Sequence, residues 1–371
     1  MKSVSILLLA TGAIAASASA GPDRVAVDKA LADVIASATI ADGPGCVAGV
    51  AKDGKLLAAR ATGLANMELK VPMRTDMAFD IGSTSKQFTA ISAAILARRG
   101  KLDLDADIRT YLPDMHAFDP PIRVRHLIGH SSGLPDVYEP LSWQYGDPDG
   151  NNYPSDLTLR MARGIRTLEA EPGSTYAYSN LGYLLLAEIV EKVSGQTLRA
   201  FADANIFKPM GMANTAFKDD PRELVPNRAS AYSLKPDGKT WEWRHSDFRV
   251  MGDGGVYSTL GDLAKWMAVF SDPSRLEGGA ELMKLVLTPA GYSKTAASWR
   301  GQPLDYGFGV QMLSHKGRRL IGHAGGWAGY GTVPYMSPDS GVAVIAICNV
   351  RKVEVLNAVL DATAGLADQP R

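Results

Sequence analysis

The sequence predicts an α+β fold in which one antiparallel sheet, built from both termini and flanked by helices, carries a mostly helical second lobe. Two observations lead to this prediction. Strand-like apolar runs occur before residue 90 and again after residue 300, whereas the segment between them has helical periodicity and long loops rich in proline and glycine. We therefore expect residues 21–371 to form a single domain. Its α/β lobe would comprise about residues 21–90 and 300–371, and its helical lobe about residues 91–299.

Residues 1–20 are expected to be an export signal. Lys2 precedes an apolar run over residues 4–16, and Ala18-Ser19-Ala20 has the small-x-small pattern of a cleavage site. The apolar run is too short to span a bilayer. An uncleaved membrane anchor is the alternative interpretation. We expect cleavage after Ala20 and a periplasmic or secreted protein without a membrane span.

The first elements of the mature chain are predicted to be a helix and a hairpin. Residues 25–38 have helical periodicity. Two strand-like runs, over residues 46–52 and 55–63, are then joined by the turn pair Asp53-Gly54. A third extended piece, over residues 78–81, leads directly to Ser83.

The C-terminal part is predicted to supply four further strands. They cover residues 306–313, 318–324, 332–336 and 342–350. The chain then ends in a helical pattern over residues 352–366. Together with the N-terminal runs, these strands account for the predicted sheet.

The two cysteines, Cys46 and Cys348, each lie in a strand-like run. Two cysteines cannot form a disulfide framework or a cysteine-rich metal site. They can pair in an oxidising compartment if their strands are neighbours, or they can remain two buried thiols. The sequence does not distinguish between these alternatives.

The charges of the chain balance, with 39 Lys+Arg against 39 Asp+Glu. This balance gives no indication of a nucleic acid or an anionic membrane as partner. The six histidines show no ligand-like spacing with carboxylates, so neither a metal nor another cofactor is expected. A small molecule or a short peptide is the expected partner, as substrate, and the oligomeric state is left open.

Ser83 and Lys86 are the first candidate catalytic pair. An extended approach ends at Gly82, and apolar residues then recur at helical spacing until Gly100. Ser83 therefore lies at a helix start, with Lys86 one turn later on the same face, where its amine can accept the hydroxyl proton. The free N–H groups of a helix N-terminus also favour an oxyanion. A serine N-cap beside an exposed lysine is the alternative interpretation.

Tyr178 and Asn180 form a second candidate pair. They end a loop just before an apolar helical pattern that stops at Gly195. In an extended segment, side chains two residues apart project the same way. A phenol can relay a proton, and a carboxamide can bind a substrate amide or the lysine. A tyrosine on a turn and an Asn N-cap would give the same pattern.

His323 begins a glycine-rich turn at the end of a predicted strand. The turn continues through Gly325 and Gly326 as far as Gly331. Glycines let a backbone approach a ligand closely and offer N–H groups to it. We therefore expect His323, Gly325 and Gly326 to bind substrate, although a single histidine on a strand is more often structural than catalytic.

In this order, Ser83-x-x-Lys86, Tyr178-Ser179-Asn180 and His323-Ala324-Gly325 resemble the three motifs of the serine penicillin-recognising hydrolases. The chain looks most like the branch of class C β-lactamases, D,D-carboxypeptidases and related esterases. The resemblance spans about residues 25–366 and implies a β-lactamase/transpeptidase-like fold. It also implies an acyl-enzyme mechanism on an ester, an amide, a D-amino-acid peptide or a β-lactam.

The resemblance assigns a role to each motif. Ser83 attacks a carbonyl carbon, Lys86 and Tyr178 share the general-base and general-acid duties, and Asn180 binds the substrate and the lysine. The backbone N–H groups of Ser83 and Gly326 hold the oxyanion. Which of Lys86 and Tyr178 is the base stays open, because the two are expected to titrate as a coupled pair.

One position departs from the β-lactamase pattern. The third motif of those enzymes is usually Lys-Thr-Gly, whose ammonium and hydroxyl help to hold a substrate carboxylate. In this chain the corresponding His323 is mostly neutral at pH 7 and Ala324 offers no side-chain hydrogen bond. The departure favours an esterase or a peptidase over an efficient β-lactamase and leaves the natural substrate unidentified.

Two alternatives compete with this interpretation. Gly129-His130-Ser131-Ser132-Gly133 matches the nucleophile elbow of α/β-hydrolases, but Leu134-Pro135 after it is typical of a turn rather than of the helix that an elbow requires. The second alternative is a catalytically idle member of the same fold that binds cell wall or a protein. The presence of Ser83, Lys86 and Tyr178 together argues against it.

Overall fold

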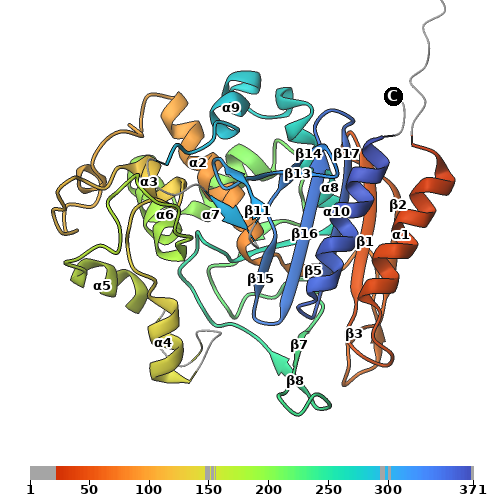
Figure 1. Cartoon of the computed structure of the whole chain (residues 1–371). Coiled ribbons are helices and arrows are strands. Elements are labelled where there is room, and N and C mark those ends of the chain that lie inside the picture. Colours follow the sequence, from red (N-terminus) through yellow and green to blue (C-terminus); the bar gives the residue numbers. More distant parts are fainter. Residues whose placement is uncertain are drawn as a thin grey trace, which may run out of the picture.

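The computed structural model describes residues 22–146, 151, 154, 156–292, 297–299 and 302–368 (Figure 1). The expected export signal, residues 1–20, lies outside the described residues. No helix in the described part of the chain has both the length and the apolar character needed to cross a bilayer.

The main sheet joins the two ends of the chain, as predicted. Among the described residues it has eight strands in the order β12-β13-β14-β16-β17-β1-β2, with β15 also paired to β16. Every pairing in it is antiparallel. The strands are β1 (Cys46–Lys52), β2 (Lys55–Thr62), β12 (Asp305–Tyr306), β13 (Gln311–His315), β14 (Arg318–Gly322), β15 (Gly325–Trp327), β16 (Tyr330–Ser337) and β17 (Val342–Cys348).

The pairing of β1 with β17 connects the N-terminal hairpin to the C-terminal strands. Its register runs from Cys46 opposite Cys348 to Lys52 opposite Val342. The two cysteines are therefore direct cross-strand neighbours, and they form a disulfide. The bond closes a sequence separation of 302 residues, and a cross-link of this kind stabilises the fold by restricting the unfolded chain.

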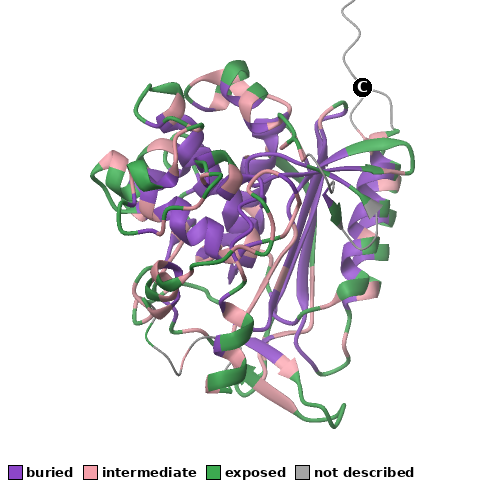
Figure 2. Cartoon of the chain, turned by 60° about the vertical axis from the view of Figure 1, so that its left-hand side comes forward, coloured by how far each residue is buried: buried purple, intermediate pink, exposed green. Residues whose placement is uncertain are grey.

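Helices cover both faces of this sheet. α1 (Arg24–Ala38) and α10 (Val353–Ala367) lie side by side on one face, and α8 (Leu260–Met267) packs on the other (Figure 1). α1 begins after Asp23, whose carboxylate accepts the N–H of Val25. Strand β1 lies between β17 and the edge strand β2 and is almost entirely buried, whereas β2 is largely exposed (Figure 2).

Two of the predicted strands have a different shape in the structure. The run over residues 306–313 is not one strand but the hairpin β12–β13, because the N–H of Gly307 donates to the carbonyl of Val310 and closes a turn. The run over residues 318–324 ends at Gly322. After His323 and Ala324 the chain resumes as β15, which pairs with β16, so the predicted glycine-rich turn narrows to Ala328 and Gly329 between these two strands.

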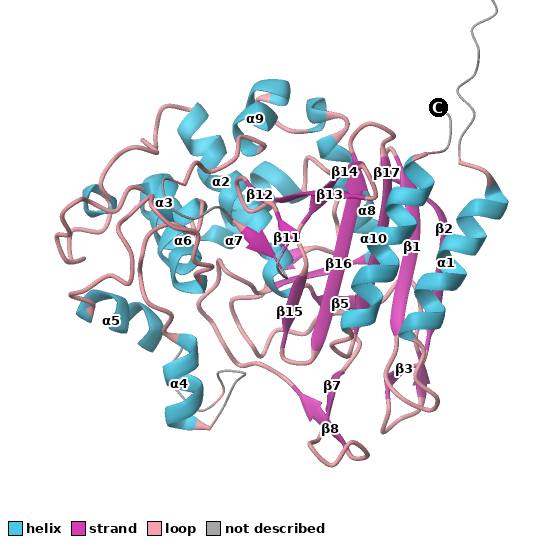
Figure 3. Cartoon of the chain, in the orientation of Figure 1, coloured by secondary structure: helices cyan, strands magenta, loops and turns pink. Residues whose placement is uncertain are grey.

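The segment between the two halves of the sheet is mostly helical and also contains short strands (Figure 3). Its helices are α2 (Lys86–Arg98), α3 (Val124–Ile128), α4 (Tyr138–Tyr145), α5 (Leu157–Gly164), α6 (Asn180–Ser194), α7 (Leu198–Ala202), α8 and α9 (Gly279–Val286). A three-stranded sheet has the order β5 (Ala78–Asp80), β9 (Val256–Thr259), β6 (Ala216–Phe217). The other short strands form three pairs: β3 (Leu64–Asn66) with β4 (Val71–Pro72), β7 (Ala231–Leu234) with β8 (Trp241–Arg244), and β10 (Ser298–Trp299) with β11 (Gln302–Pro303). The division into lobes near residues 90 and 300 stays a prediction.

Helix α2 is the buried centre of this segment. It packs against α6, and all of its residues from Lys86 to Leu96 are buried. Its polar side chains therefore need partners inside the protein. Thr89 Oγ1 donates to the carbonyl of Gly252 at 2.7 Å, and Trp266 Nε1 donates to Gln87 Oε1 at 3.1 Å. These bonds fix the helix that carries Lys86.

Candidate active site

Ser83 lies in a 3-10 turn, Gly82–Ser85, that leads from β5 into α2. The turn is set by Gly82, which has φ +51°, and by Asp80, whose Oδ1 accepts the Gly82 N–H at 2.8 Å. A left-handed φ of this kind is adopted readily only by glycine. The first N–H groups of a helical segment have no partner within it, so this turn presents the Ser83 N–H beside its own hydroxyl.

Lys86 is fully buried and donates three hydrogen bonds. Its Nζ lies 3.1 Å from Ser83 Oγ, 2.8 Å from Asn180 Oδ1 and 2.7 Å from the carbonyl oxygen of Asp253. Burial lowers the pKa of Lys86 to about 8, and the negative charge of Asp253 opposes this shift. A fraction of about one tenth of the amine is therefore neutral at pH 7.

Tyr178 covers this amine. Lys86 Nζ lies 4.9 Å from the centroid of the Tyr178 ring, and a hydrogen bond links the phenol to Ser83. Loss of water around the phenol raises the pKa of Tyr178 above its ordinary value, which the bond to Ser83 partly offsets. The phenol is therefore protonated at neutral pH, and because the residue is 40% exposed it is open to a ligand.

Tyr178 and Asn180 reach the same lysine because of the residue between them. Ser179 is the N-cap of α6, and its Oγ accepts the N–H of Gly182 at 3.0 Å. The extended cap turns Tyr178 and Asn180 toward Lys86, as the two-residue spacing predicts. Asn180 is the first helical residue rather than the cap, so its carboxamide is not used to begin the helix.

Strand β15 lies directly against the turn of Ser83. A Cβ atom on Gly82 would overlap the backbone nitrogen of Gly326, and a Cβ on Gly325 would overlap the carbonyl oxygen of Ile81. Glycine at these positions is what lets the two backbones approach each other. The arrangement brings the Gly326 nitrogen beside the residue that precedes Ser83, as expected of the second N–H of an oxyanion site.

His323 is buried, with 2% of its surface exposed. Its Nε2 lies 3.0 Å from the hydroxyl oxygen of Tyr306, and its Nδ1 lies 2.7 Å from the carbonyl oxygen of Ala324. Burial and the nearby charge of Lys86 lower the pKa of His323 to about 3. Both ring nitrogens are therefore occupied by protein groups, and the ring is neutral at pH 7.

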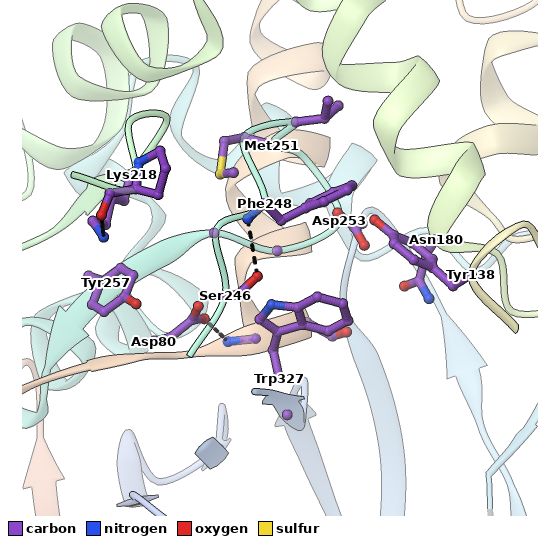
Figure 4. A pocket seen from close by; sticks show the side chains of 17 residues that line it. Asp80, Tyr138, Asn180, Lys218, Ser246, Phe248, Met251, Asp253, Tyr257 and Trp327 are labelled. Atoms are coloured by element: carbon purple, nitrogen blue, oxygen red, sulfur yellow. Dashed lines mark hydrogen bonds between the residues drawn. The ribbon is translucent and has the colours of Figure 1, made fainter. Parts of the chain in front are cut away.

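Two pockets meet at Ser83. The first has an aromatic wall of Tyr138, Phe248 and Trp327 and a polar end that contains Asp80 and Lys218 (Figure 4). Burial raises the pKa of Asp80 to about 7.

The second pocket runs along β15 past Tyr178, His323 and Gly326 toward Arg351. Within the described residues, no group of three or more His, Cys, Asp or Glu side chains is arranged to hold a metal ion.

The nucleophile-elbow alternative does not fit the local structure. Ser131 is 4% exposed, and α4 begins only at Tyr138, so Gly133 is not followed directly by a helix. The neighbouring His130, however, lies inside the site, with its ring centroid 4.2 Å from that of Tyr178. Sequence reasoning missed this contact and also missed the carbonyl of Asp253.

Comparison with known proteins gives a family match and named relatives. A family model described as Beta-lactamase matches residues 31–369. Penicillin-binding protein 4* of Bacillus subtilis (strain 168) is 30% identical over 332 residues, which cover 84% of this chain and 70% of that protein. D-aminopeptidase of Brucella anthropi is 31% identical over 315 residues, which cover 83% of this chain but only 56% of the relative.

A solved structure has the same fold. The octameric penicillin-binding protein homologue from Pyrococcus abyssi superposes with a TM-score of 0.80 at 26% identity, covering 93% of this chain and 77% of that one. The family match and the solved structure therefore both confirm the predicted antiparallel-sheet fold.

Proposed function

The chain belongs to the Beta-lactamase family, and on that premise we propose that it is a serine hydrolase that cleaves amides or esters through an acyl-enzyme on Ser83. The single observation that carries the proposal is the position of Lys86. Its amine is buried, lies 3.1 Å from Ser83 Oγ and has a pKa lowered by burial to about 8. An amine of this kind can accept the serine proton near neutral pH.

We assign the general base to Lys86 rather than to Tyr178. Burial shifts the pKa of the lysine down toward neutrality and the pKa of the tyrosine up, away from it. At pH 7 the phenol is therefore a proton donor, whereas part of the lysine is a proton acceptor. Tyr178 is hydrogen-bonded to Ser83 and lines the second pocket, where it can pass a proton to a leaving group.

The proposed reaction has two halves. The Ser83 hydroxyl gives its proton to Lys86 Nζ, and its oxygen bonds to the substrate carbonyl carbon. The backbone N–H groups of Ser83 and Gly326 bind the resulting oxyanion. The bond to the leaving amine or alcohol then breaks as that group takes a proton through Tyr178. Water adds to the acyl-enzyme by the same route in reverse and frees the carboxylic acid.

The first pocket supports an apolar or aromatic acyl group that carries an amine. The rings of Tyr138 and Phe248 lie 5.8 Å and 6.3 Å from the Trp327 ring, centroid to centroid, and form an apolar wall. Asp80, Asp253 and Lys218 line the same pocket, and the two carboxyl groups favour a substrate ammonium when they are ionised. Relatives named D-aminopeptidase support amides of D-amino acids as the substrate class.

His323 and Asn180 have polar atoms that are already bound by protein groups and therefore cannot bind substrate. Neither nitrogen of His323 is free to bind a substrate carboxylate. Asn180 uses its carboxamide oxygen on Lys86, so its NH₂ group is the part that can bind the substrate carbonyl. We therefore propose amidase or esterase activity in preference to efficient β-lactam hydrolysis, in a periplasmic or secreted protein.

The alternative of an idle binding protein is not favoured by this geometry. Burying an ammonium group costs free energy, and the cost is useful only if the lowered pKa of Lys86 serves a reaction. An idle homologue would have no need to keep this amine in contact with Ser83.

Covalent labelling tests the proposal. The protein is incubated with a fluorophosphonate, and the adduct is located by peptide mass spectrometry. We expect one adduct, on Ser83, that Ser83→Ala removes and that Ser131→Ala, the matched control in the elbow-like segment, retains. Label on Ser131, or none on the wild-type protein, would overturn the proposal.

A substrate panel tests the acyl group. We expect D-amino acid 4-nitroanilides with a free amine to be cleaved faster than their N-acetylated forms, and nitrocefin to be cleaved slowly. Equal rates for free and acetylated amines would remove Asp80 and Asp253 from the proposed recognition of the substrate.

A further inference from the structure

His130 is a buried group that the proposed reaction does not use. It is fully buried, and its φ of +55° lies in the left-handed region that side-chain-bearing residues rarely adopt. Its ring contacts that of Tyr178, with 4.2 Å between the ring centroids and the ring planes tilted by 33°. A strained backbone that persists beside a reactive side chain is a reason to look for a role there.

A continuous series of hydrogen bonds starts at this histidine. His130 Nδ1 accepts the backbone N–H of Ser179 at 3.1 Å, and His130 Nε2 lies 2.9 Å from the hydroxyl of Tyr306. The same hydroxyl lies 3.0 Å from His323 Nε2, and His323 Nδ1 lies 2.7 Å from the carbonyl of Ala324. We call His130, Tyr306 and His323 the histidine bridge.

The two ends of the bridge fix the tautomer of each histidine ring. A backbone N–H can only donate, so His130 Nδ1 accepts and the ring proton is on Nε2, which donates to Tyr306. A carbonyl can only accept, so His323 carries its proton on Nδ1 and accepts the Tyr306 hydroxyl on Nε2. Both rings are then neutral, and Tyr306 also shares a hydrogen bond with Tyr183, whose own hydroxyl donates to the carbonyl of Ile128.

The bridge closes a ring around the nucleophile. The carbonyl of His323 accepts the hydroxyl of Thr84 at 2.8 Å, and Thr84 follows Ser83 in the chain. On the other side, Lys86 donates to Asn180, which follows Ser179. The three segments that carry Ser83, Tyr178 and Gly325 are therefore linked to one another by side chains as well as by packing.

We propose that His130 and Tyr306 are positioning residues, and that with His323 they hold the Tyr178–Asn180 segment in register with β15 around Ser83. This inference rests on the proposed function. It adds His130 and Tyr306 to the site and gives a role to His323 of the third motif. His323 acts through Tyr306 on the position of Tyr178 rather than by contact with substrate. The bridge transfers no proton, because each of its donors already faces an acceptor.

The bridge also gives a physical reason for histidine in place of lysine at position 323. A lysine has three donors and no acceptor, so it could not accept the Tyr306 hydroxyl. The Tyr306 hydroxyl would lose the acceptor that His323 Nε2 provides, while its oxygen would accept from both His130 and the lysine. His130, Tyr306 and His323 therefore depend on one another as a set.

The sharpest test is Tyr306→Phe, which removes one hydroxyl and keeps the ring. We expect kcat to fall at least tenfold, KM to change less than threefold and the apparent pKa of the pH–rate profile to stay where it is. The matched control is Tyr232→Phe, another buried tyrosine, whose hydroxyl is hydrogen-bonded to Glu68, Met67 and Ser230. If both variants lose the same activity for the same loss of thermal stability, the bridge is only structural and the proposal is wrong.

The two halves of the bridge can be separated at His130. In His130→Asn the Oδ1 can still accept the Ser179 N–H, whereas in His130→Gln the amide NH₂ can still donate to Tyr306. We expect each to lose activity, and the double variant Tyr306→Phe with His323→Asn to lose no more than the worse single variant. Additive losses would mean independent sites and would contradict a single bridge.

One measurement tests the bridge independently of turnover. In ¹⁵N-histidine-labelled protein, NMR is expected to show His130 as the Nε2–H tautomer and His323 as the Nδ1–H tautomer, both neutral at pH 7. The opposite tautomer at either residue would overturn the bridge even if Ser83 labels normally. Conversely, absence of labelling on Ser83 with both tautomers as expected would overturn the proposed function alone.

Discussion

Lys86 and His323 are two buried nitrogen bases of the same site, and their surroundings give them different roles. Burial lowers the pKa of both groups, to about 8 for Lys86 and to about 3 for His323. The lysine keeps a hydrogen bond to the hydroxyl that reacts, whereas the histidine has both nitrogens bound by groups that do not react. Burial alone therefore does not make a group a catalytic base. The hydrogen-bond partner determines whether the buried group can take a proton from the reacting hydroxyl.

The largest expected effect comes from removing the amine. Lys86→Met keeps the volume of the side chain but removes the proton acceptor of Ser83, so kcat/KM should fall by about 10² to 10⁴. Steady-state kinetics on a 4-nitrophenyl ester measure this loss. A variant that keeps near-full rate at neutral pH would show that Lys86 is not the base.

A smaller loss is expected on the histidine side. His323→Asn can still donate to the carbonyl of Ala324 but cannot accept the Tyr306 hydroxyl, so we expect kcat/KM to fall by roughly tenfold, in line with one lost buried hydrogen bond. The same assay measures it. A loss as large as that of Lys86→Met would place His323 in the chemical step and remove the contrast between the two sides.

The charge beside Lys86 allows a finer comparison. The carboxylate of Asp253 raises the pKa of Lys86 against the effect of burial, so Asp253→Asn should lower it further. The pH–rate midpoint is then expected to move to lower pH, with a change in rate of only a few fold. Burial, Lys86 and the carbonyl of Ala324 shift the pKa of His323, and Asp253 is not among these causes. If the midpoint of the pH–rate profile does not move in Asp253→Asn, Lys86 does not determine that profile.

A separate effect is expected on acid stability. Burial keeps the pKa of His130 and of His323 below that of an unfolded histidine, about 6.5. The unfolded chain therefore binds more protons below pH 6.5, and the stability that the neutral rings contribute is lost as the pH falls from about 6.5 toward 3. In His323→Asn, the free energy of unfolding should depend less on pH, by about 1.4 kcal/mol per pH unit between pH 5 and 4. Urea titrations at several pH values measure it, and identical slopes would contradict a neutral His323.

The motifs that the sequence revealed are those whose geometry is local. Ser83 and Lys86 are one helical turn apart, and Tyr178 and Asn180 flank one cap residue, so spacing alone predicts which side chains meet. The antiparallel sheet was predictable for a similar reason, because apolar runs at both ends of a chain have few other ways to be buried.

The remaining parts of the site depend on distant contacts that no local pattern shows. His130 looked like part of a nucleophile elbow, and its partner Tyr306 lies 176 residues away in the sequence. Lys86 donates to the backbone carbonyl of Asp253. Any residue type at position 253 would supply this carbonyl, so the sequence gives no sign of the contact. The break between β12 and β13 did have a signal, since Gly307 and Gly309 interrupt the apolar run, and it was overlooked.

The most direct test of the account is the pH dependence of Ser83 acylation by a neutral fluorophosphonate. If the neutral amine of Lys86 is the base, the second-order rate constant should rise about tenfold per pH unit below its midpoint and level off above a midpoint near 8. A midpoint near 6.5, the ordinary value for histidine, or a rate independent of pH would contradict it.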